Sequence, residues 1–151
     1  MKKAWLAPTL VATVLSLVTT IALRPSVAQP EQKNIQAKAA GVIGSGSFAT
    51  ITPGETTTGT AEAYQEGNRT FIKFSSDFST AHGPDLKVLL HKQYPPKSYD
   101  KGSYVLLDKL KSFDGTQVYE LPKGISLAEY PNLILWCQSF NVTFAGAKLG
   151  R

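Results

Sequence analysis

The hydrophobic positions of this chain fall into two regions with different patterns. Residues 4–23 form a largely apolar stretch without a charged residue, whereas from Val42 onward short apolar runs are separated by Gly, Pro, Asp and Asn. The second pattern is typical of an all-β domain, and no convincing helical stripe interrupts it. It predicts strands at residues 45–51, 60–65, 70–74, 86–91, 104–107, 117–121, 133–138 and 140–147.

These runs predict an antiparallel β-sandwich or a closed barrel of about eight or more strands. Turn residues support antiparallel pairing of neighbouring runs, because residues 66–68 (Glu-Gly-Asn) tolerate positive φ and Asp114-Gly115 is a strong tight-hairpin sequence. Ser126 and Glu129 have capping-box spacing and predict a single helical turn. That turn is too short to change the fold class.

The N-terminal stretch predicts a secretory signal peptide over residues 1–28. Lys2 and Lys3 form its basic start, and Ser-Val-Ala at residues 26–28 provides the small residues of a cleavage site. An uncleaved N-terminal membrane anchor is the minor alternative, since the uncharged stretch is long enough to cross a bilayer. We therefore expect an exported protein, periplasmic or extracellular, with a flexible linker at residues 29–41 and one β-domain at residues 42–151.

The net charge of the chain limits the class of partner that we expect for it. The chain has 16 Lys and Arg against 11 Asp and Glu, but Lys2, Lys3 and Arg24 belong to the leader. The expected domain is therefore only weakly basic, which argues against nucleic acid. The expected partner is an unknown redox partner or a cell-surface ligand, and the membrane is reached only through the N-terminal signal or an uncleaved anchor.

Cys137 is the only cysteine of the chain, and an unpaired thiol in an exported protein needs an explanation. Alternation along the C-terminal runs places Trp136 and Phe144 on one face and Cys137 on the other, where that second face changes from apolar to polar. We therefore expect Cys137 near the edge of a covered region, accessible to a small reactant or a cofactor. The alternatives are a buried, inert cysteine and, for Trp136, an ordinary core anchor.

Other candidate ligands are few. His82 lies in a loop and His91 ends a predicted strand. We predict no metal site: no His follows Cys137, the only methionine is Met1, and one Cys with two scattered His does not approach four-ligand spacing. Covalent haem lacks its Cys-x-x-Cys-His sequence, whereas a non-covalent haem with a thiolate or histidine ligand is compatible with the chain. The cofactor is therefore unknown.

Catalytic motifs of the common enzyme classes are absent from the sequence. It contains neither a Gly-x-Ser-x-Gly nucleophile elbow nor a phosphate-binding glycine loop. We therefore expect a redox-associated or binding module rather than a classical enzyme.

Two segments carry a resemblance to a known family. Gly-Pro-Asp-Leu at residues 83–86 and Trp-Cys-Gln-Ser-Phe-Asn-Val-Thr-Phe at residues 136–144 are similar to the DM13 domain, and the resemblance covers about residues 44–149. It implies an extracytoplasmic β-domain with a characteristic cysteine, which maps onto Cys137. It also implies redox or electron-transfer chemistry, through that thiol or through a bound prosthetic group.

Two functional hypotheses follow. In the first, the domain is an extracytoplasmic redox or electron-transfer module with Cys137 as its working residue and with Trp136, His91 and His82 beside a cofactor. One thiol cannot form an internal disulfide, so this hypothesis needs a sulfenic acid, a mixed disulfide, an intermolecular bridge or a bound cofactor. In the second, the domain is a non-catalytic binding or cell-surface module with a buried structural cysteine, and loops 75–85 and 92–102 make the contacts.

Overall fold

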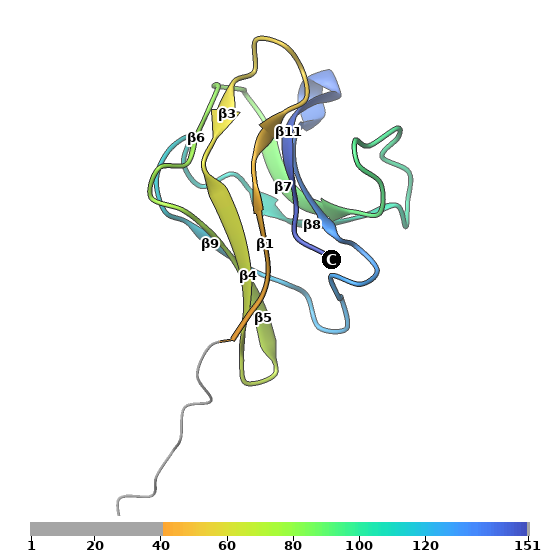
Figure 1. Ribbon diagram of the computed structural model, residues 1–151. Helices are drawn as coiled ribbons and strands as arrows, with labels where there is room; N and C mark the ends of the chain where they lie inside the picture. Colours follow the sequence, from red (N-terminus) through yellow and green to blue (C-terminus); the bar gives the residue numbers. More distant parts are fainter. Residues whose placement is uncertain (1–40, 151) are drawn as a thin grey trace, which may run out of the picture. The chain divides into compact units, whose positions relative to one another are not determined.

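The computed structural model describes residues 41–150, and these form an almost wholly β-stranded domain (Figure 1). The predicted signal peptide and nearly all of the predicted linker lie outside the described residues. Within residues 41–150 no helix has the length and apolar character needed to cross a membrane. The elements are β1 (Gly41–Ser47), β2 (Ala49–Thr50), β3 (Thr57–Thr58), β4 (Thr60–Glu66), β5 (Arg69–Phe74), β6 (Ser79–Thr80), β7 (Leu86–His91), β8 (Tyr104–Lys109), β9 (Val118–Glu120), β10 (Asn132–Cys137), the 3₁₀ turn η1 (Gln138–Phe140) and β11 (Val142–Lys148).

Two antiparallel sheets pack as a sandwich (Figure 1). The first sheet has the strand order β1-β4-β5-β9, the second has the order β2-β11-β10-β7-β8, and β3 pairs with β6 in a short third sheet. The all-β sandwich prediction is therefore confirmed. No closed barrel is found among residues 41–150, since the two main sheets remain separate.

The core lies between the sheets and follows from the alternation of side chains along each strand. Its fully buried members include Ala61, Ala63, Ile72 and Phe74 from the first sheet and Val88, Leu90, Leu133, Leu135 and Cys137 from the second. Every residue of β7 and β10 is buried, so the second sheet is covered on its outer face as well. That outer face carries a smaller cluster, formed by Leu89, Ile134 and Trp136 with Ile51, Tyr94, Tyr99 and Tyr104 around them.

The two sheets approach each other closely where β1 runs beside the backbone at the C-terminal end of β11. A Cβ atom at Gly44 would overlap with the carbonyl oxygen of Leu149, and a Cβ atom at Gly46 would overlap with the carbonyl oxygen of Lys148. Only glycine lets the two backbones pack this closely. These two glycines therefore position the first sheet against the second.

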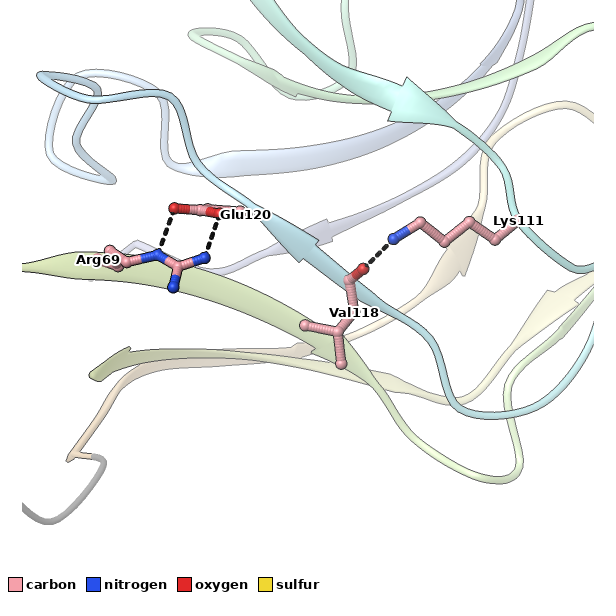
Figure 2. A network of polar contacts seen from close by, with 4 residues as sticks. All are labelled: Arg69, Lys111, Val118 and Glu120. Carbon is pink, nitrogen blue, oxygen red and sulfur yellow. Dashed lines mark hydrogen bonds and ion pairs between the residues drawn. The ribbon is translucent and has the colours of Figure 1, made fainter. Parts of the chain in front are cut away.

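Polar contacts hold β9 and the segment that leads into it (Figure 2). Arg69 of β5 donates two hydrogen bonds of 2.6 Å to the carboxylate of Glu120, and Lys111 donates from Nζ to the carbonyl oxygen of Val118 at 2.5 Å. The hydrogen bond and charge of Arg69 lower the pKa of Glu120, and Glu120 raises the pKa of Arg69. Because the ion pair is exposed, it aligns β9 on β5 more than it stabilises the fold.

The turn predictions have mixed outcomes. The hairpin at residues 66–68 is confirmed, because Glu66 pairs with Arg69 and Gly67 has a φ of 59°. The hairpin at Asp114-Gly115 is wrong: β8 and β9, on either side of it, belong to different sheets. Gly115 does turn, with a φ of 76°, but the chain crosses between the sheets there, because turn chemistry reverses a chain without choosing which strands pair.

Of two local predictions near the C-terminus, one is confirmed and one is corrected. The segment from Ser126 to Tyr130 forms a single helical turn that does not continue, with the Tyr130 amide donating to the Ser126 carbonyl at 3.0 Å. Phe144 packs in the core with Cys137 and not on the face of Trp136. The pairing of β10 with β11 skips Phe144 at a bulge, which turns this side chain to the inner face.

Candidate functional site

Strand β10 presents Trp136 and Cys137 to two different environments. Successive side chains of a strand point to opposite faces, so Cys137 faces the core between the sheets and Trp136 faces the outer cluster. The two residues that the sequence placed at one site are therefore separated by the sheet itself.

Cys137 has no exposed surface, with a relative accessibility of 0 %. Its cross-strand partners are Leu86 of β7 and Val142 of β11. The expectation that this cysteine is accessible at the edge of a covered region is therefore wrong. The polar residues that follow it leave the sheet in η1, so the change from apolar to polar lies just beyond the strand end and not at the sulfur.

The chain reaches the surface directly after Cys137. The next three residues, Gln138–Phe140, are exposed, and the partner Leu86 lines a pocket of about 140 Å³ together with Phe113. Cys137 itself is not among the residues that line this pocket. Leu86 therefore both pairs with Cys137 across the strands and lines this pocket.

Asp85 fastens this end of the strand. Its carbonyl oxygen accepts a hydrogen bond of 3.1 Å from the Gln138 amide, and its carboxylate accepts one of 3.4 Å from Ser139. The carboxylate also pairs with Lys87 at 2.8 Å, which lowers the pKa of Asp85. A single loop residue thus ties the chain before β7 to the chain after β10.

On the outer face, Trp136 lies in a compact group of aromatic rings. The Tyr99 ring stacks on the Trp136 ring, with 4.1 Å between centroids and 15° between planes. Tyr104 meets both rings edge-on, at 6.0 Å from Trp136 and 5.8 Å from Tyr99, and His91 meets Tyr99 at 5.7 Å. We call Trp136, Tyr99 and Tyr104 the aromatic cluster.

Hydrogen bonds orient the members of the aromatic cluster. The indole N–H of Trp136 donates to Asn141 Oδ1 at 3.1 Å, and the Tyr99 hydroxyl shares a bond of 2.5 Å with Thr143 Oγ1. Both partners belong to the turn and strand that follow Cys137, so β11 holds the cluster against β10. The rings of Trp136 and Tyr99 therefore have one defined arrangement, as expected for side chains whose polar atoms are bonded.

The two histidines occupy different parts of the domain. His91 is buried, its Nδ1 accepts from the Gln93 amide at 2.9 Å, and its Nε2 donates to the Ser98 carbonyl at 2.9 Å. Both ring nitrogens therefore hold the loop after β7. His82 is exposed and stacks on Phe113 with 4.1 Å between centroids, beside the pocket that Leu86 lines.

The structure thus brings Trp136 and His91 together around Tyr99, while Cys137 and His82 lie on the other side of the second sheet. Tyr104 was not predicted as a site residue, and Tyr99 was considered only as part of the contact loop 92–102 of the binding hypothesis. The pairing of Tyr104 with His91 across β7 and β8 sets its position, and no local sequence signal reveals that pairing.

A haem fits neither Cys137 nor His91 as an axial ligand. An axial ligand needs a sulfur or ring nitrogen that faces an open cavity. Cys137 has no exposed surface, and both nitrogens of His91 are bonded to the loop that it supports. Within residues 41–150 no group of three or more His, Cys, Asp or Glu could hold a metal ion.

Alkaline pH should destabilise the domain through its buried tyrosines. Burial raises the pKa of Tyr99 and of Tyr119 to about 12, against about 10 for an unfolded tyrosine. The stabilisation is complete below about pH 10 and is lost as pH rises towards about 12, because the unfolded chain ionises first. Urea unfolding midpoints across this range should fall less steeply in Tyr99→Phe, and an identical fall in wild type and variant would contradict the assignment.

Comparison with known proteins supports the resemblance to the DM13 domain. A family model described as "Electron transfer DM13" matches residues 48–149, which is most of the chain and runs from just before β2 to just after β11. No curated protein and no solved structure matches the chain. The chain therefore belongs to the DM13 family, and its general role is electron transfer.

Proposed function

We propose that this domain transfers electrons outside the cytoplasm and that Cys137 is its redox-active group. The family match supports the electron-transfer role, and residues 1–28 support export, which predicts a mature chain whose mass corresponds to a start at Gln29. The observation that carries the cysteine assignment is its place at the end of β10, paired with Leu86, which lines a surface pocket. No other cysteine is available for thiol chemistry.

Burial decides how such a thiol could work. A thiol reacts as its thiolate and must touch its reactant, so neither a partner sulfur nor a peroxide reaches Cys137 in the closed domain. Local opening exposes a strand end at a lower free energy than global unfolding. Such an opening would release η1 from Asp85 and would move the Leu86 side chain away from Cys137. The sulfur would then be exposed while both sheets stay paired. The closed state would protect it from irreversible oxidation.

The test is the rate of thiol labelling of the native protein with a small maleimide at low urea. We expect slow labelling that Leu86→Ala accelerates roughly tenfold, corresponding to about 1.4 kcal/mol less opening free energy. Leu121→Ala is the matched control, because it also truncates a buried leucine but one that does not pair with Cys137. It should leave labelling at low urea unchanged. The absorbance spectrum should show no visible band from a haem on Cys137, since that sulfur has no exposed surface.

The second candidate is a binding or cell-surface module with a structural cysteine, and the complete burial of Cys137 among apolar residues favours it. Its proposed contact loops are only partly free, because Tyr94 and Tyr99 of loop 92–102 pack towards the outer cluster. If labelling of Cys137 follows global unfolding in its urea dependence, and Leu86→Ala and Leu121→Ala accelerate it equally, the redox assignment of the cysteine fails and this candidate stands.

A further inference from the structure

We propose that Trp136 and Tyr104, bridged by Tyr99, form a relay for single electrons on the outer face of the second sheet. The proposal rests on the electron-transfer role but not on Cys137, which lies on the other face of the same strand. It assigns a function to side chains outside the cysteine site.

The contacts within the aromatic cluster suit electron exchange. Indole and phenol are, with thiols, the protein side chains most easily oxidised by one electron, and tunnelling between them falls steeply with distance. The Trp136 and Tyr99 rings are parallel at 4.1 Å, and Tyr104 lies 6.0 Å from Trp136 and 5.8 Å from Tyr99. Each ring is therefore in or near contact with the other two, and no saturated side chain has to carry the electron between them.

The members of the aromatic cluster differ in burial, and we assign them different roles for this reason. Trp136 is only 7 % exposed, whereas Tyr104 is half-buried. No buried polar side-chain atom of residues 41–150 lacks a hydrogen-bond partner, and none of these residues bonds to the Tyr104 hydroxyl, so this hydroxyl reaches water. The Tyr99 hydroxyl is instead bonded to Thr143. Tyr104 is therefore the member that can release a proton to solvent, and Tyr99 is the ring that positions Trp136.

The relay moves one electron at a time through Trp136 and Tyr104. An outer-sphere one-electron oxidant takes one electron from Trp136 and leaves the indole radical cation. Tyr104 returns one electron to Trp136 and releases its phenolic proton to water, which leaves a neutral tyrosyl radical. A one-electron reductant, with a proton from water, then restores Tyr104. The net result is the passage of one electron from the reductant to the oxidant.

A purely structural cluster would show the same contacts, so the test must detect radicals. The full chain carrying Trp5→Phe, in which Trp136 is the only tryptophan, is oxidised by photogenerated tris(bipyridine)ruthenium(III). Transient absorption and electron paramagnetic resonance then follow the radicals. We expect a tryptophan radical that converts to a tyrosyl radical, and Tyr104→Phe should lengthen the tryptophan radical lifetime about tenfold or more.

The matched control is Tyr64→Phe, because Tyr64 is also half-buried and stacked but belongs to the first sheet. It should leave the lifetime unchanged. An unchanged lifetime in Tyr104→Phe, or an equal change in Tyr64→Phe, overturns the relay. In Cys137→Ala the tyrosyl radical should persist, so the relay can hold even if thiol labelling rejects the redox role of Cys137. Loss of the tyrosyl radical in Cys137→Ala would instead make the sulfur the carrier and sink the relay.

Discussion

Gly44→Ala should lower the free energy of unfolding by about 3 kcal/mol, the upper part of the range for overpacked sites. The added Cβ would overlap with the carbonyl oxygen of Leu149, and it would lie 3.4 Å from a Leu127 methyl group. The first obstacle is backbone, so no rotamer change removes the overlap. The strands must move apart at the approach that joins the two sheets, and part of the core must open with them.

Gly41→Ala is the matched control because Gly41 belongs to the same strand. A Cβ atom there would have no neighbour within 4 Å, and Gly41 has no positive φ. Its substitution should change stability by no more than about 0.5 kcal/mol. Chemical denaturation followed by far-ultraviolet circular dichroism measures both variants. Similar losses in both would show that β1 responds to lost backbone freedom and not to the close approach.

Alternation along the chain was sufficient to predict an antiparallel all-β fold, but it left open whether this is a sandwich or a closed barrel. The pattern in β10 separates Leu133 and Leu135 from Ile134 and Trp136, and the structure places these pairs on opposite faces of the second sheet. This succeeds because an apolar side chain on either face must be covered, so burial follows the period of two. The resemblance to DM13 rested on residues 83–86 and on residues 136–144, which begin in this strand, and it is confirmed by the family match.

The partner of each strand could not be predicted in the same way. Asp114-Gly115 indicates a turn, yet β8 pairs with β7 and β9 pairs with β5. Pairing depends on contacts between residues far apart in sequence, and local turn chemistry does not encode them. The sequence left the burial of Cys137 open for a related reason, because the extent of its cover depends on where β10 ends and on the bulge at Phe144.

The contacts of the aromatic cluster could not be predicted from the sequence either. The sequence indicated that Tyr99 belongs to a loop and left open whether it faces a ligand or the domain. Its hydroxyl bonds to Thr143, and its ring covers Trp136. These contacts join three separate segments of the chain, so only the folded structure reveals them. Loop aromatics that could serve recognition are here used to cover the outer face of the sheet.

Trp136→Ala should lower the free energy of unfolding by about 3–5 kcal/mol, the range for large aromatic side chains removed from a core. Trp136 is 7 % exposed, and its loss removes the surface on which Tyr99 stacks and the donor to Asn141. The loop that contains Tyr99 should then detach from the sheet. Circular dichroism measures the stability, and trypsin cleavage at the exposed Lys97 and Lys101 should become faster.

Trp136→Phe separates packing from the indole itself. Phenylalanine keeps a ring against Tyr99 but loses the hydrogen bond to Asn141, so the loss should be smaller than in Trp136→Ala, about 1–3 kcal/mol. If both variants lose the same stability and Lys97 becomes no easier to cleave, the ring does not support the loop. The cluster would then be too loosely held to keep its rings at the separations that the electron relay requires.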